Sequence, residues 1–226
     1  MKLVYDGKTK KVYDLENGNF LFEFKDDGTV DEAGNFDPGG NRAGIVVKGM
    51  GSANLRLSDF FFKKINEAGI ASHYVSADLE KSTMTVKPAE FFGNGLEFIC
   101  RFKATGSFMR RYASYAKEGQ DLPALVEITV KDDEHGDPPI TRECLEALGL
   151  INEGEYSELV SMTQKIAVLI KNELAKKDAL LYDIKFEFGR RDGKIILIDE
   201  ISGGSMRVYK EGTILHPFDI AGLILS

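Results

Sequence analysis

The sequence predicts a two-lobed α+β protein, with a mainly antiparallel β N-terminal lobe and a mixed α+β C-terminal lobe. Two observations predict this class. Short strand-like runs dominate residues 1–88, and the helical periods that follow flank strands without a regular βαβ alternation. The chain has 226 residues, enough for two lobes of about 100 residues each. We therefore expect the lobes to comprise residues 1–88 and 89–226.

The N-terminal lobe is expected to begin with a hairpin and to contain one helix. In residues 10–25, an Asn-Gly pair of the kind favoured in tight β-turns precedes three alternating phenylalanines. Residues 26–52 are dense in Gly, Asp and Asn, and a loop of this length predicts a functional lid. Helical spacing of apolar residues follows over 54–68, with Gly69 just after the last turn.

The remaining helices and strands are predicted in the same way, from the spacing of their apolar residues and from the residues that begin or end them. Ser107 is a good N-cap residue for one of the helices, and Gly149 ends the next. The strands are expected near 73–75, 84–86, 96–102 and 126–130, and the helices near 108–116, 141–148 and 155–176.

The segment 183–207 carries the strongest sign of a functional site. Asp183, Lys185 and Glu187 alternate with apolar residues, so in a strand their side chains project from one face. A turn then returns the chain as an apolar run that ends in two further acids. Because like charges opposite each other destabilise a sheet, a bound cation or substrate is the expected reason for this cluster.

Which of the two returning acids joins that face depends on the number of residues in the turn. An odd number would place Asp199 beside Glu187. An even number, such as a two-residue turn at Asp192-Gly193, would place Glu200 there instead. The residues alone leave both arrangements open, together with the simpler interpretation of an edge hairpin whose acids face water.

Composition restricts the classes of function. Hydrophobic residues make up 43% and charged residues 29%, as in ordinary globular proteins. The net charge of −7 disfavours bulk attraction to nucleic acid or to an anionic membrane. No apolar run reaches the roughly 18 residues of a membrane span. The two cysteines are too few for a disulfide framework, so we expect a cytoplasmic protein.

Two basic segments are candidates for anion binding. Residues 6–11, DGKTKK, lack the spacing of a Walker loop and precede a strand, so a kinase-like glycine-rich turn is the closer analogue. A solvated lysine run is the simpler interpretation. In the second segment, Arg101 precedes Ser107 and Arg111 at a predicted helix start, where a phosphate or carboxylate could bind. A capped helix with exposed arginines is the alternative.

A third segment, KDDEHGDP at 131–138, crowds acids at the end of a strand. Such a group can balance a metal ion, hold an amine or form a turn. The three histidines of the chain show no metal-ligand spacing, so ordinary surface or core positions are expected for them.

Taken together, these segments resemble the phosphoribosylaminoimidazole-succinocarboxamide synthase (SAICAR synthetase) family. The matching motifs occur in the family's order and cover nearly the whole chain. They are GKTKKVY at 7–13, KG at 48–49, EAGI at 67–70, ATGSF at 104–108, KDD and DP within 131–138, DIKFEFG at 183–189, and DEIS at 199–202 followed by Arg207.

The resemblance implies a SAICAR synthase-like fold with a kinase-like ATP site in residues 1–88, and a ribotide and metal site in residues 89–226. It implies an ATP-dependent C–N ligase (EC 6.3.2.6) of de novo purine biosynthesis. L-Aspartate is joined to the carboxylate of CAIR, an aminoimidazole carboxylate ribotide, through an acyl phosphate, giving SAICAR, ADP and phosphate. Mg²⁺ is the implied metal, and the family's frequent self-association implies a homo-oligomer.

The resemblance also implies roles for individual residues. Those that match family positions around the nucleotide are Gly7, Lys8, Thr9, Lys10, Val12, Lys131, Glu187 and Asp199. Those around the ribotide are Arg101, Ser107, Arg111, Lys185 and Arg207. Those at the reacting centre are Lys131, Asp137, Asp183 and Lys185. The metal ligands are Glu187 and Asp199, which implies the odd-numbered turn.

The chain departs from the common bacterial pattern at Phe102, Gly136, Gly203 and Gly204. These departures concern the recognition of aspartate. They motivate an alternative hypothesis, a different carboxylate–amine ligase or small-molecule kinase on the same scaffold. A non-catalytic nucleotide-binding module is a further alternative, which the retained acids and lysines disfavour.

Overall fold

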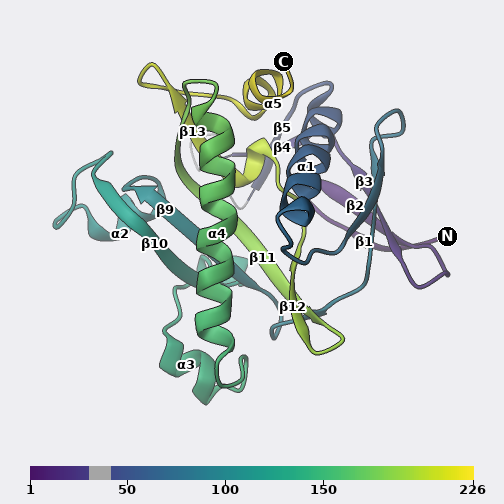
Figure 1. Ribbon diagram of the computed structural model, residues 1–226, viewed down its shortest axis with the longest axis horizontal. Coiled ribbons are helices and arrows are strands. Elements are labelled where there is room, and N and C mark those ends of the chain that lie inside the picture. The colour runs from purple at the N-terminus through teal and green to yellow at the C-terminus, as the bar shows by residue number, and fades with distance from the viewer. Residues whose placement is uncertain (31–41) are drawn as a thin grey trace.

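The computed structural model describes residues 1–30 and 42–226. The described chain is an α+β fold with two main antiparallel sheets, one between residues 2 and 86 and the other between residues 90 and 214. Figure 1 shows strands β1–β3 on one side of the molecule and strands β9 and β10 on the other, with β11 running between them. This arrangement confirms the predicted α+β class and its two lobes.

The first sheet has the strand order β1-β2-β3-β7-β6. The predicted hairpin is present as β2 and β3, in which alternation buries Phe22 and Phe24. Helix α1 packs on this sheet through the apolar positions Leu57, Phe61 and Ile65, all of them buried. The elements are β1 (Lys2–Asp6), β2 (Lys10–Asp14), β3 (Phe20–Phe24), α1 (Met50–Glu67), β6 (Tyr74–Asp78), β7 (Thr83–Val86) and a separate pair, β4 (Asp27–Val30) with β5 (Arg42–Val46).

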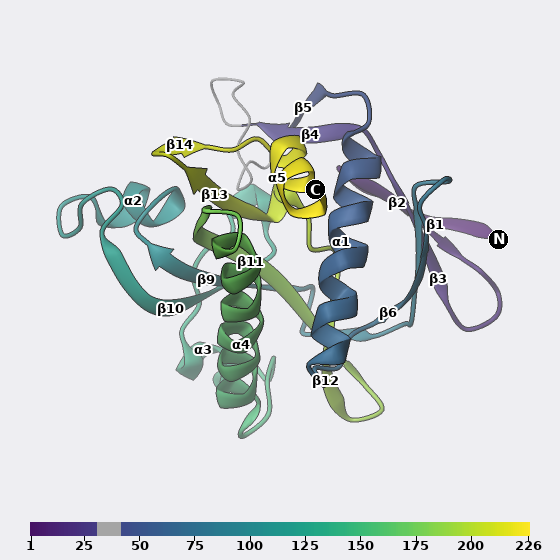
Figure 2. The same ribbon diagram turned by 45° about the horizontal axis from the view of Figure 1, so that its top comes forward.

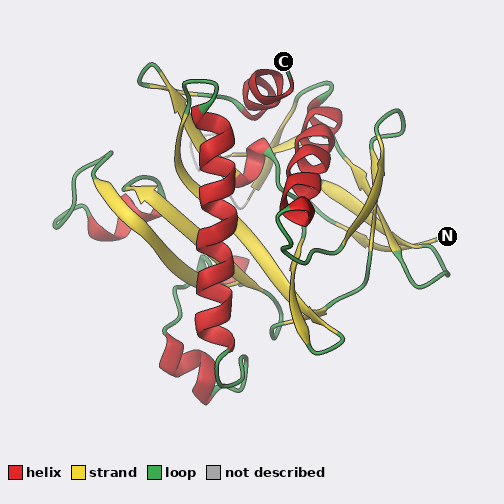
Figure 3. Cartoon of the chain, viewed as in Figure 1, coloured by secondary structure: helices red, strands yellow, loops and turns green. Residues whose placement is uncertain are grey.

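The second sheet has the strand order β10-β9-β11-β13-β14, and the long strand β11 also pairs with β12 and β8. Helix α4 lies across one face of this sheet (Figure 3) and contacts β9, β10 and β11. Its strands are β8 (Glu90–Phe91), β9 (Leu96–Lys103), β10 (Asp121–Val130), β11 (Leu180–Arg191), β12 (Lys194–Ile198), β13 (Met206–Lys210) and β14 (Thr213–Ile214). Its helices are α2 (Ser107–Tyr112), α3 (Arg142–Ala147), α4 (Glu155–Ala175), α5 (Pro217–Leu225) and the short 3₁₀ turns η1 (Asp133–His135) and η2 (Gly203–Ser205).

The two sheets are tied together by backbone and by helices. The His73 amide donates to the carbonyl of Leu197 at 2.9 Å, and the Leu197 amide donates to that of Ala71 at 3.0 Å. Helix α5 packs beside α1 (Figure 2). Gly203 approaches Pro217 so closely that an added Cβ would lie 2.4 Å from the proline Cα. The glycine at this departure from the family pattern is therefore required by the packing of η2 on α5.

Several sequence expectations need correction at their boundaries. The helix predicted over 54–68 begins four residues earlier, at Met50, because Asp26 accepts hydrogen bonds from the Gly49 and Gly51 amides. Part of the predicted lid, residues 26–52, therefore forms strands and a helix start, whereas residues 31–41 lie outside the described chain.

Ser107 was wrongly predicted as an N-cap. Gly106 holds that position with φ 56° and ψ −129°, a backbone conformation that suits glycine. Ser107 is instead the first residue of α2, and its hydroxyl accepts a hydrogen bond from Nη2 of Arg101 at 2.9 Å. The predicted helix 108–116 is correspondingly short and ends at Tyr112.

The number of residues in the turn between β11 and β12 also differs from the odd number that the resemblance implied. Arg191 pairs with Lys194, so the turn holds the two residues Asp192 and Gly193, an even number. Within a regular hairpin this register would direct Asp199 away from the face of Glu187. The prediction of an odd-numbered turn was therefore wrong. The position of the Asp199 side chain is not explained by the register of the hairpin.

None of the helices in the described part of the chain combines the length and the apolar character that a membrane crossing needs.

Candidate active site

Two cavities adjoin one another in the molecule. The larger, of about 800 Å³, lies between the β1–β2 turn, the start of α1, the middle of β11 and the end of β12. The smaller, of about 300 Å³, lies over the middle of β9, β11 and β13 beside α2. Both volumes suit small-molecule ligands. Four residues line both cavities and so mark their boundary: Glu97, Asp137, Lys185 and Ser205.

The β1–β2 turn forms one wall of the larger cavity. The Gly7 amide donates to the Lys10 carbonyl at 2.9 Å and closes the turn. A Cβ on Gly7 would lie 2.7 Å from the ring of Tyr5, so glycine suits this close approach. The predicted nucleotide residues of this segment all line the cavity, and apolar side chains add a surface fit for a flat ring: Gly7, Lys8, Thr9, Lys10 and Val12, with Phe20, Phe22, Met50, Val86 and Ile198.

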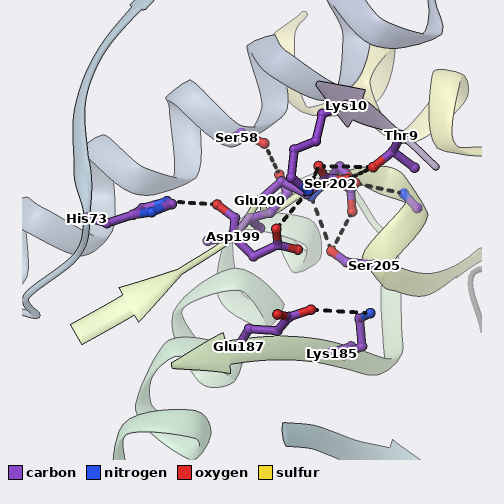
Figure 4. Close-up of polar contacts among 12 residues, drawn as sticks. Thr9, Lys10, Ser58, His73, Lys185, Glu187, Asp199, Glu200, Ser202 and Ser205 are labelled. Atoms are coloured by element: carbon purple, nitrogen blue, oxygen red, sulfur yellow. Dashed lines mark hydrogen bonds and ion pairs between the residues drawn. The ribbon is translucent and has the colours of Figure 1, made fainter. Parts of the chain in front are cut away.

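Lys10 reaches from this turn to the far end of β12. Its Nζ lies 2.7 Å from Oδ1 of Asp199 and 2.7 Å from Oε2 of Glu200 (Figure 4). Burial alone would lower the pKa of Lys10, but the two carboxylates raise that pKa above its usual value. Lys10 is therefore a permanent cation.

Asp199 faces Glu187 although the turn is even, because its backbone leaves the strand conformation. Asp199 has φ 66°, in the left-handed region, directly after the end of β12. The buried ring of His73 donates from Nε2 to the Asp199 carbonyl at 2.8 Å and fixes this conformation. Burial lowers the pKa of His73 to about 4, so the ring is neutral. Figure 4 shows the resulting approach of the two carboxylates.

The pKa values of Glu187 and Asp199 are shifted in opposite directions. Burial, together with the charge of Asp199, raises the pKa of Glu187. Burial would also raise the pKa of Asp199, but Lys10 and Lys131 lower it below its usual range. Lys131 Nζ donates to both oxygens of Glu187, at 2.9 and 3.1 Å. The result is a pair of acids, Glu187 buried and Asp199 partly buried, in which Lys131 holds Glu187 and Lys10 holds Asp199.

These acids suit a divalent metal that also binds phosphate. Mg²⁺ in proteins is commonly held by one or two carboxylates, with substrate phosphates and water completing its octahedron. Glu187 and Asp199 supply two such carboxylates, and a dication between them would relieve their repulsion. In residues 1–30 and 42–226 no group of three or more His, Cys, Asp or Glu side chains surrounds one ion position, so a cage made of protein ligands alone is not formed there.

Alternating charges line the smaller cavity. The strand order β9-β11-β13 places Asp183 directly opposite Arg101 on one side and Arg207 on the other. Asp183 Oδ2 accepts from Nη1 of Arg101 at 2.7 Å and from Nη1 of Arg207 at 2.9 Å. Glu127 on β10 extends the row, since it pairs with Arg101 and accepts from Arg111 at 2.6 Å.

The arginines outnumber the acids in this row, which favours an anionic ligand. Arg101, Arg111 and Arg207 oppose Asp183 and Glu127, so the row carries one net positive charge when all five groups are ionised. Nε of Arg111 is also buried and has no hydrogen-bond partner in the described chain. A buried donor of this kind is costly unless a ligand or water accepts from it.

The remaining predicted residues lie between the two groups. Lys185 and Asp137 are at the boundary of the cavities. Asp137 has φ 51° and accepts from the Asp132 amide at 2.8 Å, which holds the loop after β10 against the site. Lys8 pairs with Asp133 in the same loop at 2.8 Å. The structure thus brings together every residue for which the sequence predicted a role.

Three functional candidates were missed in the sequence. Glu97 and Glu127 alternate with apolar residues on β9 and β10, so the alternation that singled out Asp183 could have found them. His73 gave no such signal. Glu200 was weighed only as the alternative to Asp199, whereas the structure places both acids on Lys10.

Gly106→Ala tests the ribotide role that the resemblance implies for the smaller cavity, and it is expected to weaken ribotide binding selectively. The new Cβ would lie 2.6 Å from Cζ of Arg207 and would displace that guanidinium. We expect the KM for the ribotide to rise by about tenfold or more, equivalent to about 1.4 kcal/mol, with the KM for ATP within about twofold of wild type. Steady-state kinetics would measure both constants.

Gly119→Ala is the matched control, because Gly119 also has a positive φ, of 74°, but its nearest neighbour would lie 3.9 Å from the added Cβ. It shares the positive φ without the clash. An equal rise in the ribotide KM in both variants would contradict the displacement of Arg207.

Comparisons with known proteins agree with this geometry. A family model described as SAICAR synthetase matches residues 3–217. A phosphoribosylaminoimidazole-succinocarboxamide synthase of Clostridium tetani is 55% identical over the full length of both chains. One of Thermotoga maritima is 36% identical over 93% of this chain and 86% of its own. A solved SAICAR synthetase in complex with ADP has a TM-score of 0.83 and 32% identity, covering 94% of this chain and 87% of its own.

Fold and site together define a two-lobed α+β protein with a nucleotide-sized cavity that opens onto an arginine-lined one. The family match and the relatives make the assignment specific. The chain belongs to the SAICAR synthetase family.

Proposed function

We propose that this protein joins L-aspartate to the carboxylate of CAIR, forming SAICAR while ATP becomes ADP and phosphate, in de novo purine biosynthesis. One observation supports this most directly. The cavity that holds paired acids and lysines meets the arginine-lined cavity at Lys185 and Asp137. A phosphoryl donor and a carboxylate acceptor can therefore reach one another at that boundary. The free state of Cys100 and Cys144 is in keeping with a reducing cytosolic setting.

The larger cavity takes ATP in this proposal. The apolar side chains around Val12 receive the adenine, and the β1–β2 turn covers the phosphates with its backbone N–H groups and lysines. The ADP complex of a SAICAR synthetase relative supports this use of the nucleotide. The proposed contacts are Gly7, Lys8, Thr9, Lys10, Val12, Lys131, Glu187 and Asp199.

Glu187 and Asp199 are the proposed ligands of Mg²⁺. The bound ion would neutralise charge on the phosphates and orient them. Lys10 fixes Asp199 from the opposite side, at 2.7 Å, so the carboxylate has one defined position.

The smaller cavity takes the ribotide. Its phosphate is matched by Arg101, Arg111 and Arg207, whose forked donors suit phosphate oxygens. The buried, unpaired Nε of Arg111 and the hydroxyl of Ser107 add further donors. Asp183 aligns two of the guanidiniums and so acts on the ribotide through them.

The chemistry then needs charge neutralisation more than covalent participation by the protein. A carboxylate oxygen of CAIR attacks the γ-phosphorus of ATP, the bond to the bridging oxygen breaks, and ADP leaves. The aspartate amine attacks the carbonyl carbon of the acyl phosphate, and phosphate departs with the electrons of the C–O bond as the amine loses its proton. Lys185 and Lys131 hold positive charge beside the transferring group, and Asp137 lies next to the reacting carbonyl.

A coupled assay of ADP release tests the proposal. ADP should form with CAIR, aspartate, ATP and Mg²⁺ together, and omission of any one should reduce the rate to background. Gly204, one of the positions at which the resemblance is weakest, lines the larger cavity and motivates as second candidate a ligase for another carboxylate–amine pair. Faster ADP release with such a pair than with CAIR and aspartate would select that candidate.

Arg207→Ala is expected to raise the KM for the ribotide by about tenfold or more while the KM for ATP changes by less than about twofold. The variant removes one guanidinium from the phosphate, a loss of about 1.5–3 kcal/mol for a charged hydrogen bond. Asp183 keeps Arg101 as its partner at 2.7 Å, which limits the cost to the fold.

Arg142→Ala is the control, because Arg142 is exposed and pairs with Glu146 within α3, away from both cavities. Equal changes in the two KM values of Arg207→Ala would contradict specific binding of the ribotide by Arg207.

A further inference from the structure

Glu97 lies in a row of polar side chains that crosses the second sheet. On β9 it is directly opposite Glu187 of β11 on one side and Thr129 of β10 on the other. Its side chain is only 14% exposed. Two carboxylates directly opposite each other on neighbouring strands repel, so this register needs a compensating cation.

Lys185 supplies that cation. Two residues before Glu187 on the same strand, it projects from the same face. Its Nζ lies 2.7 Å from Oε1 of Glu97 and 3.8 Å from Oε1 of Glu187 (Figure 4 shows its approach to Glu187). The contact with Glu97 is a full hydrogen bond, whereas that with Glu187 is a looser ion pair.

The second oxygen of Glu97 is also engaged. The Thr129 hydroxyl donates to Oε2 at 3.2 Å, and Thr129 is itself buried. The Glu97 carboxylate is thus held in one orientation by β10 and presents its other oxygen to Lys185.

A bound divalent cation would change the interactions that Glu187 and Glu97 make. Glu187 would direct its oxygens toward the ion, and the ion's charge would repel a neighbouring ammonium. Lys131 is half-exposed and can turn toward the phosphates. Lys185 has to remain at the boundary of the two cavities, and Glu97 is the acid placed to hold it there.

We infer that Glu97 is a positioning residue, which keeps the ammonium of Lys185 at the junction of the cavities and away from Glu187 when Mg²⁺ and nucleotide bind. The inference rests on the proposed function, because it takes Glu187 as a metal ligand. Of the two opposed carboxylates, Glu187 would bind the metal and Glu97 would hold Lys185.

Glu97→Gln tests this division through nucleotide binding rather than turnover. Glutamine keeps the shape of the side chain but not its charge, so Lys185 retains Glu187 as carboxylate partner and competes with Mg²⁺ for it. Calorimetric titration of ADP at a series of Mg²⁺ concentrations should show the half-saturating Mg²⁺ concentration raised about fivefold or more. In turnover, kcat should fall by about 10- to 100-fold with the KM for ATP within about threefold.

The same substitution made in the Lys185→Met protein separates competition by the Lys185 ammonium from the simple loss of a negative charge near the metal. In Lys185→Met the competing ammonium is gone, so adding Glu97→Gln should leave the half-saturating Mg²⁺ concentration within about twofold. If Glu97→Gln raises it equally in both backgrounds, Glu97 acts on the metal by charge alone and the inference fails.

The matched control is Glu127→Gln, an equally buried acid on the next strand that holds arginines and not Lys185. It should alter the ribotide KM and leave the Mg²⁺ dependence of ADP binding unchanged. ADP binding without Mg²⁺ reports on folding in every variant. If wild-type ADP binding is independent of Mg²⁺, the proposed metal site is wrong; if it depends on Mg²⁺ and Glu97→Gln matches wild type, only the positioning role is wrong.

Discussion

Glu187→Gln is expected to lower kcat by about 10³-fold or more while the protein stays folded. The side chain is buried and faces Asp199, and a neutral amide binds Mg²⁺ far more weakly than a carboxylate does. A 10³-fold loss corresponds to about 4 kcal/mol of transition-state stabilisation.

The stability of this variant should be equal to or above that of wild type at pH 7 without metal. The pKa of Glu187 is raised in the folded state, chiefly by burial. Its ionisation therefore opposes folding as pH rises through the folded-state pKa, and the opposition vanishes below the unfolded-state value of about 4.5. The gain of Glu187→Gln over wild type should thus be greater at pH 7 than at pH 4.

Thermal denaturation at the two pH values and steady-state kinetics would check these expectations. Asp192→Asn is the control from the same hairpin, because Asp192 is exposed at the turn and asparagine accepts its positive φ of 52°. Near wild-type turnover of Glu187→Gln would show that the metal site is elsewhere.

Lys10→Met is expected to lower both the stability and the affinity for ATP. The change removes the cation that lies 2.7 Å from both Asp199 and Glu200, and leaves the buried Glu200 and the partly buried Asp199 without it. Breaking a buried ion pair in this way typically costs about 3–5 kcal/mol. The KM for ATP should also rise by about tenfold or more, since Asp199 is no longer held and the charge that we propose to contact the phosphates is lost.

The pH dependence of this loss follows from the two shifts. Lys10 has a raised pKa, so its contribution is fully present below the unfolded-state pKa of about 10.5 and is lost only as pH rises through the folded value. Asp199 has a lowered pKa, so its contribution is present above about pH 3.8 and is lost as pH falls through the folded value. The difference between Lys10→Met and wild type should be nearly constant from pH 6 to 9 and shrink in acid.

Urea denaturation across this range would measure the difference. Lys11→Met is the matched control, because Lys11 follows on the same strand, projects from the other face and lines neither cavity. Equal destabilisation by both substitutions would show that the paired acids do not depend on Lys10.

Local pattern was enough to predict much of the site. Alternation in β11 placed Asp183, Lys185 and Glu187 on one face, because the direction of successive side chains in a strand depends only on backbone geometry. The motif order identified the family, and the hairpin of β2 and β3 and the helices α3 and α4 were predicted within a few residues. The boundary of the lobes at residue 88 and the assigned roles remain predictions.

The sequence by itself determined the residue types, their local faces and the family to which they belong. Only the tertiary structure decided which strands are neighbours, and hence that Asp183 lies between Arg101 and Arg207. It also decided that Asp199 turns toward Glu187, because a single left-handed residue held by a distant histidine overrides the alternation of the hairpin. Strand order and such backbone exceptions arise from contacts between residues far apart in the chain, which local periodicity does not encode.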